Sequence, residues 1–364
     1  VGTPLTAPQA ARFLTQATFG PKMSDINALT GQSAEAWLNQ QFAKPQSLHV
    51  PTIEALLRAR LADADTTNDR SYQDDFMQAF WTNAAKGDDQ LRQRVAFALS
   101  QIFVISFDSA LSDDVRGVAA YYDMLGRNSF GNFRTLLEDV SLHPMMGIYL
   151  SHIQNQKEDP KTGRMPDENY AREIMQLFSI GLYQLNPDGS QVLSGGKPVE
   201  TYDNDDITGL AKVFTGWSYG GADKSDGRFY NVSAGRDPNH HVIPMQGYPK
   251  FHSISEKSFL GVTIPAQTTA APEADLKIAL DTIFKHPNVG PFIGKQLIQR
   301  LVTSNPSSAY VSRVSAAFAN NGAGVRGDMK AVIRAVLLDP EARDANGALA
   351  QTTSYGKIRE PVLR

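Results

Sequence analysis

The segment from Asp167 to Gly181 carries the clearest helical pattern in the chain. With about 3.6 residues per turn, a helix over this segment has one apolar side and one polar side. The apolar side holds Tyr170, Ile174, Leu177 and Phe178, and the polar side holds Asn169, Arg172, Glu173 and Gln176. Glu168 and Arg172 can form an i,i+4 ion pair, and Asp167 can cap the first turn. We predict an amphipathic helix here that packs on a core and presents a polar face.

Helical patterns recur on both sides of this segment. We expect successive helices over residues 6–150, including a largely apolar one over 88–105 and another over 133–143, and then helices at 273–285, 288–302, 307–319 and 328–338. Between 182 and 202, short alternating runs around Asn186-Pro187-Asp188-Gly189 and Gly195-Gly196 predict a β-hairpin or two turns. Residues 218–272 are rich in Gly, Ser, Asp, Asn and His, which is typical of a functional or disordered loop.

The fold class that follows is mainly α. We predict a large multi-helix domain with a loop-rich insertion that contains a short β-hairpin. The N-terminal helical part spans 1–181, the insertion 182–272 and the C-terminal helical part 273–364, and we expect one compact domain overall. The chain begins at Val1 rather than Met, as either removal of a leader or trimming of a longer chain would leave it. It stops at Arg364 without a helix terminator, so we expect the domain to continue beyond that residue.

Composition excludes several classes of function. The net charge is −3, with 35 Lys plus Arg against 38 Asp plus Glu, which disfavours nucleic acid as a partner. There are no cysteines, which removes thiolate metal sites, cysteine nucleophiles and disulfides. No apolar run approaches the roughly 20 residues of a membrane span. The sequence also lacks a G-x-S-x-G elbow, a P-loop and a dinucleotide fingerprint, so we predict no cofactor and disfavour nucleotide chemistry.

Five blocks of sequence occur in a fixed order along nearly the whole chain. They are residues Ala11 to Pro21, Glu168 to Met175, Phe214 to Trp217, Lys257 to Gly261, and Arg359 to Pro361. In content and spacing these blocks resemble the bacterial family known as domain of unknown function 1800. The resemblance implies a mainly helical, exported protein, periplasmic or secreted, often encoded beside a second exported protein family. It implies no established activity.

The chain departs from the family pattern in two places. Many relatives have a Trp and His-rich end on the helix that corresponds to 88–105, whereas this chain has Ser100-Gln101-Ile102-Phe103. A histidine-dependent site at that position is therefore not expected. Family members also continue past the Arg-Glu-Pro block, which gives a second reason to expect a continuation beyond Arg364.

The polar face of the 167–181 helix supplies the catalytic candidates. We assign Glu173 as acid or base, with Arg172 orienting it or binding an anionic group, and Glu168 beside them. Glu168 and Glu173 lie about 140° apart around a helix, so a paired-carboxylate mechanism needs a second acid from another segment. Asp203, Asp205, Asp206 or Glu138 can supply it. The alternative is that Arg172 and Glu173 belong to a buried ion-pair network that joins helices.

Substrate-binding candidates come from this helix and from the insertion. They are Asn169, Gln176, Trp217, His240, His241 and His252. Trp217, with Tyr219, Phe229 and Tyr230, can stack on a sugar ring or fasten the insertion to the helical body. A metal site split between His240 or His241 and His252 is a further possibility, but no zinc-ligand spacing is present and we predict no metal. The Asp203–Asp206 run invites a calcium interpretation, although capping of a helix by Asp205 or Asp206 explains it better.

Two functions remain open at the level of sequence. The first is a hydrolase or lyase that acts on an extracellular polymer such as a glycan, with Glu173 in a cleft covered by the insertion. The second is a non-catalytic assembly or binding protein that works with another exported protein. An enzyme requires the Glu173 carboxylate to be open to a pocket, whereas a scaffold allows it to be enclosed by arginine and backbone donors.

Overall fold

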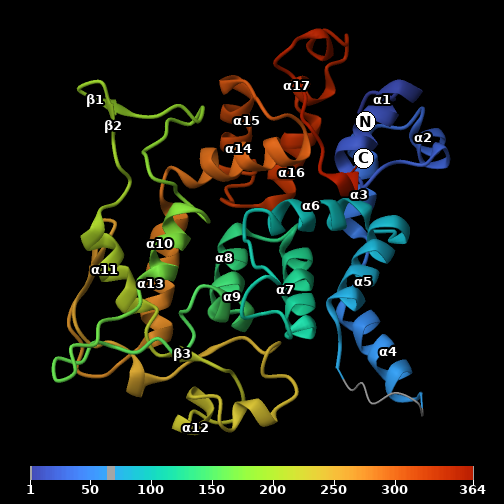
Figure 1. Cartoon of the computed structure of the whole chain (residues 1–364). Coiled ribbons are helices and arrows are strands. Elements are labelled where there is room, and N and C mark those ends of the chain that lie inside the picture. Colours follow the sequence, from blue (N-terminus) through green and yellow to red (C-terminus); the bar gives the residue numbers. More distant parts are fainter. Residues whose placement is uncertain (1, 64–69, 364) are drawn as a thin grey trace.

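The computed structural model describes residues 2–63 and 70–363. Within these residues the chain forms seventeen α-helices and three two-stranded antiparallel sheets. The predicted fold class, mainly α with a short β-hairpin, is confirmed. Figure 1 shows the chain, with the N-terminus and the C-terminus close together at one side of the molecule.

Ten helices precede the insertion. They are α1 (Ala7–Ala17), α2 (Met23–Leu29), α3 (Ala34–Ala43), α4 (Val50–Leu61), α5 (Gln73–Lys86), α6 (Gln90–Ser100), α7 (Val115–Asn128), α8 (Phe133–Leu142), α9 (Pro144–Tyr149) and α10 (Asn169–Gln176). The predicted helix over 88–105 is wrong at its end, because α6 stops at Ser100 and residues 101–105 continue as turns and extended chain. Ile102 and Phe103 are nevertheless buried in the core, as their apolar character indicates.

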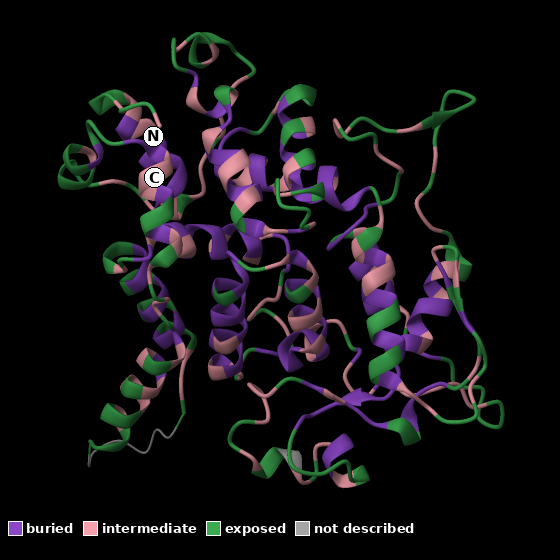
Figure 2. Cartoon of the chain, turned by 180° about the vertical axis from the view of Figure 1, so that it is seen from behind, coloured by how far each residue is buried: buried purple, intermediate pink, exposed green. Residues whose placement is uncertain are grey.

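The insertion contains short elements joined by loops. They are β1 (Leu193–Ser194), β2 (Lys197–Pro198), α11 (Asn204–Val213), β3 (Trp217–Ser218), α12 (Asp226–Phe229), β4 (Gln246–Gly247), β5 (Lys257–Phe259) and β6 (Val262–Ile264). β1 pairs with β2, and Gly195 and Gly196 form the turn between them with positive φ angles. The predicted β-hairpin is thus present, and Figure 2 shows it exposed along its length while the helices at the centre are buried.

The cap of α11 differs from the prediction. Asp203, rather than Asp205 or Asp206, is the N-cap, and its Oδ1 accepts hydrogen bonds from the backbone N–H groups of both of those residues. Asp206 completes a capping box by accepting from the Asp203 N–H at 3.0 Å. The acidic run is therefore accounted for by helix capping, with the cap two residues before Asp205.

Five helices close the chain. They are α13 (Pro272–Lys285), α14 (Val289–Leu301), α15 (Ser308–Ala319), α16 (Met329–Leu338) and α17 (Pro340–Arg343). The first four match the predicted helices to within one residue at each end. Side chains from the first and last parts of the chain meet in one hydrophobic core, to which Phe13, Leu99, Leu136, Ile298 and Ile333 all contribute without exposure.

Residues 218–272 are not a structureless loop. Phe229, Tyr248 and Phe251 form a small second core, in which the rings of Phe229 and Phe251 stack with centroids 3.8 Å apart. Trp217 and Tyr219 are buried as well, and only Tyr230 of the four aromatic residues considered for sugar stacking is exposed. Most of these aromatic side chains therefore fasten the insertion together and to the helical body.

Candidate functional site

The predicted catalytic residues lie close together at the start of helix α10: Glu168 is its N-cap residue, and Arg172 and Glu173 are within the helix. The side chain of Glu168 makes no capping bond, and the predicted cap Asp167 lies one residue earlier, where its Oδ1 accepts the Asn169 N–H at 2.8 Å. The buried side of α10 consists of Tyr170, Ala171, Ile174 and Met175. The helix ends at Gln176, earlier than predicted, and Leu177 is exposed. The chain then turns away, and the backbone N–H groups of Ile180 and Gly181 both donate to the Met175 carbonyl.

Arg172 pairs with Glu168 and not with Glu173. Nη2 of Arg172 lies 3.7 Å from Oε2 of Glu168, the predicted i,i+4 pair, and both side chains are more than a third exposed. An exposed pair of this kind contributes little to stability. Over the described part of the chain, Arg172 makes no ion pair with Glu173. Arg172 and Glu173 therefore do not form the buried ion-pair network of the alternative interpretation.

The Glu173 carboxyl is partly buried and lacks a partner. Its Oε2 is shielded from solvent and has no hydrogen bond among the residues that the structure describes. Burial raises the pKa of Glu173 above its usual value, against a smaller opposing effect of the Arg172 guanidinium. An upward shift is also the direction seen in carboxyl groups that act as general acids.

Tyr202 adds a polar group to this cluster that the sequence did not single out. Its hydroxyl lies 3.4 Å from Oε1 of Gln176, at the long end for a hydrogen bond. Burial raises the pKa of Tyr202, which Arg172 opposes and Glu173 reinforces through their charges. We call Glu168, Arg172, Glu173, Gln176 and Tyr202 the α10 cluster.

The proposed second acids do not join the α10 cluster through any contact in the described residues. Asp203 and Asp206 use their carboxylates to cap α11, and Asp206 also accepts the Leu260 N–H at 2.6 Å. Glu138 is paired with Arg134 at 2.6 Å. Thr208 does connect α11 to the cluster, because its hydroxyl donates to Oε1 of Glu168 at 3.0 Å. Asn169 points elsewhere, donating to the Leu150 carbonyl at 3.3 Å.

Trp217 lies away from the α10 cluster, at the wall of a cavity. Its indole N–H donates to the Val213 carbonyl at 3.1 Å, and its ring is almost completely buried. The ring lines a cavity of about 510 Å³ whose wall also contains Arg134, Glu138 and Glu273. The structure therefore brings Trp217 together with Glu138, one of the proposed acids, and not with Glu173.

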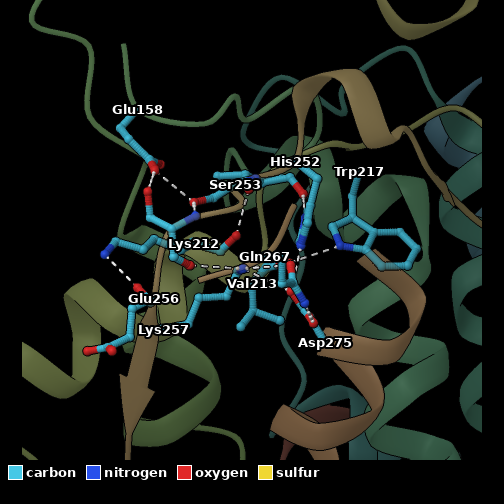
Figure 3. Close-up of polar contacts among 12 residues, drawn as sticks. Glu158, Lys212, Val213, Trp217, His252, Ser253, Glu256, Lys257, Gln267 and Asp275 are labelled. Atoms are coloured by element: carbon cyan, nitrogen blue, oxygen red, sulfur yellow. Dashed lines mark hydrogen bonds and ion pairs between the residues drawn. The ribbon is translucent and has the colours of Figure 1, made fainter. Parts of the chain in front are cut away.

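His252 lies inside a buried polar network, shown in Figure 3. Nδ1 lies 2.7 Å from the Thr215 carbonyl oxygen, and Nε2 lies 3.0 Å from Oδ2 of Asp275. The ring thus joins the backbone at Thr215 to the Asp275 carboxylate. Because His252 is completely buried and both ring nitrogens are occupied, it does not present a surface to a substrate.

His240 and His241 form a third group. Nδ1 of His241 lies 2.6 Å from Oδ1 of Asp114, and Nδ1 of His240 lies 2.6 Å from the Asp237 carbonyl oxygen. Their rings are 3.8 Å apart at the centroids, beside Tyr219. Burial lowers the pKa of His240. The predicted substrate-binding residues are thus divided among four places, and only Asn169 and Gln176 share a helix with Glu173.

Residues 2–63 and 70–363 contain no group of three or more His, Asp or Glu side chains placed to hold a metal ion. The split site between His252 and His240 or His241 is accordingly not formed there. Among the helices in this part of the chain, none is both long and apolar enough to cross a membrane.

Comparison with known proteins identifies the family. The model of the family described as protein of unknown function (DUF1800) matches residues 12–364. The chain belongs to this family. No curated protein and no solved structure matches the chain significantly. The resemblance expected from the five sequence blocks is confirmed, and DUF1800 membership brings no reaction with it.

Two blocks on which the DUF1800 resemblance rested meet in the buried network. Thr215 and Trp217 come from one block and Lys257 from another, and Lys257 lies 2.9 Å from Oδ2 of Asp275. Gln267 donates to the other oxygen of Asp275 at 2.7 Å. Sequence reasoning missed Asp275 and Gln267 because neither stands in a motif. The one signal in the sequence was Lys257, because a lysine in a segment with the pattern of a strand needs an acidic partner if it is buried.

Proposed function

We propose that this DUF1800 protein is a hydrolase or lyase that acts on an extracellular polymer such as a glycan. The observation that carries the proposal is the Glu173 carboxyl, which is partly buried, has no protein partner in the described residues and has a raised pKa. Leaving a carboxyl unpaired costs stability, and such groups are more common at functional sites than elsewhere. In this proposal the protein works in the periplasm or outside the cell, as the family resemblance implies.

The other members of the α10 cluster have roles that follow from their contacts. Glu173 donates a proton to the leaving oxygen of the polymer as the C–O bond breaks, and the water molecule that adds to the carbon returns a proton to the Glu173 carboxylate. Arg172 is paired with Glu168 and remains more than a third exposed, so it can bind an anionic or hydroxyl group of the substrate. Its positive charge also lowers the pKa of Glu173, against the larger effect of burial. Gln176 and Tyr202 supply an amide and a hydroxyl for orientation. Asn169 extends the exposed polar edge at the start of the helix.

The second candidate is a non-catalytic assembly or binding protein that pairs with another exported protein. One observation favours it. Leu177, Leu182 and Tyr183 follow α10 directly and are 49%, 47% and 38% exposed, which gives the region an apolar surface beside the polar cluster. Exposed apolar side chains grouped in this way are typical of contact surfaces between proteins.

Turnover of an extracellular glycan and peptide library distinguishes the two candidates. The parent, Glu173→Gln and the control Glu200→Gln are compared, since Glu200 is an exposed glutamate on the β-hairpin. The enzyme proposal expects turnover by the parent and the control and a loss of at least about 100-fold in Glu173→Gln, the usual contribution of a general acid. Turnover that survives in Glu173→Gln, or a library that the parent binds but does not convert, favours the other candidate.

A further inference from the structure

A groove of about 580 Å³ lies between helices α1–α3 on one side and the end of α5, with the loop to α6, on the other. Its wall comes from residues 14–44 and 81–90, together with Val362, and we call it the N-terminal groove. Figure 1 shows these helices together at one side of the molecule. None of the wall residues belongs to the α10 cluster. The volume is within the range of small-molecule sites in proteins.

Two tryptophan side chains contribute to the wall of the groove. Trp81 is 49% exposed, and Trp37 is partly buried. Each ring is held edge to face by a phenylalanine, because Phe80 lies 5.7 Å from Trp81 and Phe13 lies 5.2 Å from Trp37 between ring centroids. Both indole rings are thus fixed in position by the core. An accessible indole ring beside polar groups suits the apolar face of a sugar ring.

Three lysines also line the groove, and none of them is paired. Within the described residues, the ammonium groups of Lys22, Lys44 and Lys86 make neither an ion pair nor a hydrogen bond. Each ammonium has three N–H donors. Lys22 and Lys86 are exposed, and Lys44 is partly buried. Three unpaired cations around one groove favour a ligand with negative charge, although the net charge of the whole chain is −3.

Hydrogen-bond acceptors lie beside these donors. Asp25, Asp88 and the amide of Gln40 line the groove and are exposed. Oδ2 of Asp25 accepts the backbone N–H of Lys22 at 2.9 Å, and Oδ1 has no partner among the described residues. Carboxylate and amide oxygens of this kind accept hydrogen bonds from hydroxyl groups, whereas the two carboxylates would repel the closely spaced phosphates of a nucleic acid. The wall therefore favours a saccharide over a nucleic acid.

We propose that the N-terminal groove binds an acidic saccharide, one that carries carboxylate or sulfate groups. A sugar ring lies on the indole of Trp81, its hydroxyl groups donate to Asp25 and Asp88, and its acidic groups contact the three lysines. This site holds a ligand without reacting with it. Binding there does not depend on Glu173 or on the reaction proposed for the α10 cluster.

Two matched pairs of probes test the charge of the ligand. Hexagalacturonate is compared with its methyl ester, and sulfated maltohexaose with maltohexaose, by isothermal titration calorimetry. At least one acidic probe should bind the parent more tightly than its neutral counterpart, and the pair that shows this preference identifies carboxylate or sulfate as the group bound. The preference should disappear in about 1 M salt, because salt screens exposed charges. The readout is binding, so it is independent of turnover.

Variants locate the site in the groove. Lys22→Ala, Lys44→Ala and Lys86→Ala should each weaken the acidic probe by about two- to fivefold, as loss of an exposed charge pair does, and leave the neutral probe unchanged. Trp81→Ala should weaken both probes about tenfold, because the apolar face under the sugar is lost, whereas Trp81→Phe should keep most of the affinity. The matched control is Lys197→Ala, at an exposed and unpaired lysine on the β-hairpin, which should change neither value.

The proposal is overturned if neither acidic probe binds the parent more tightly than its neutral counterpart. It is equally overturned if the lysine variants weaken the acidic and neutral probes alike, or if Lys197→Ala weakens binding as much as they do. Single-stranded oligothymidylate that binds more tightly than either saccharide, and less tightly in the same lysine variants, would assign the groove to nucleic acid instead. Lys86→Glu, at the exposed end of α5, stands in for an alanine variant that does not fold and should weaken the acidic probe further than Lys86→Ala.

Discussion

Lys257 and His252 contact the same oxygen of Asp275, at 2.9 and 3.0 Å. All three side chains are completely or almost completely buried. Lys257 comes from β5, His252 from the loop before it and Asp275 from the first turn of α13, so a single carboxylate fastens the insertion to the C-terminal helical part. A buried charge cluster of this kind depends on every partner being present.

Replacing Asp275 should therefore destabilise the protein strongly. We expect Asp275→Asn to lower the free energy of unfolding by about 3–5 kcal/mol, because the buried Lys257 ammonium would then lose its counter-ion. Denaturant unfolding measures the effect. The matched control is Glu273→Gln, an exposed carboxylate two residues earlier in the same helix, which should change stability by less than about 0.5 kcal/mol. Equal effects in the two variants would show that the cluster contributes nothing.

The same carboxylate predicts a pH dependence of stability. Burial raises the pKa of Asp275, but hydrogen bonds from His252, Lys257 and Gln267 outweigh burial and hold it below its usual value. A lowered pKa in the folded state means that the stabilisation is complete above the unfolded value, about pH 4, and is lost as the pH falls through the folded value. The difference in melting temperature between the parent and Asp275→Asn should therefore be largest near neutral pH and shrink below about pH 4. A constant difference would contradict this.

The packing of α11 against β5 depends on a glycine. A Cβ placed on Gly209 would lie 1.7 Å from the Ser258 carbonyl oxygen, which is backbone and cannot swing aside. We expect Gly209→Ala to lower the free energy of unfolding by at least about 1–3 kcal/mol, as overpacking does. Gly131→Ala is the control, since its Cβ would meet nothing closer than 3.7 Å. Thermal melts of the two variants measure the difference. An unchanged melting temperature in Gly209→Ala would contradict the prediction, since it would mean that α11 and β5 move apart at no cost in stability.

Much of the fold could be predicted because it rests on local patterns. Helix α15 starts at Ser308 after the Ser307 cap, and turns fall at Gly189 and at Gly195-Gly196, as the sequence indicates. The end of α6 at Ser100 could not be predicted, since the apolar run from Ile102 continues the pattern of a buried helix while the chain leaves the helix to fill the core. The contact of Gly209 with Ser258 could not be predicted either, because the two residues are far apart in the sequence and no local pattern links them.

The candidate site was predictable in part for the same reason. Helical periodicity placed Arg172, Glu173 and Gln176 on one face, because all three belong to one helix. It could not show that His252 is buried, since that depends on Asp275, 23 residues further along the chain. Nor could it show that Tyr202 approaches Gln176, since the β-hairpin separates the two residues in the sequence. Polar residues in a loop look alike in sequence whether they face solvent or a buried partner.

Glu173 should reduce the stability of the protein at neutral pH. Its pKa is raised by burial in the folded state, so the ionised carboxylate disfavours folding above that pKa, while the protonated form at low pH does not. Glu173→Gln should therefore melt higher than the parent at pH 7, and the difference should shrink as the pH falls and vanish well below the unfolded pKa of about 4.3, where the carboxyl is protonated in both states. A variant that melts lower than the parent at pH 7 would make Glu173 a structural residue.

The most direct test of the proposed function is the pH dependence of polymer turnover by the parent and by Glu173→Gln. If Glu173 is the general acid, kcat/KM of the parent falls as the pH rises through the raised pKa of Glu173, and Glu173→Gln loses both most of the activity and this basic limb. A Glu173→Gln variant that turns over the polymer with the rate and pH profile of the parent would contradict the central claim that Glu173 donates the proton.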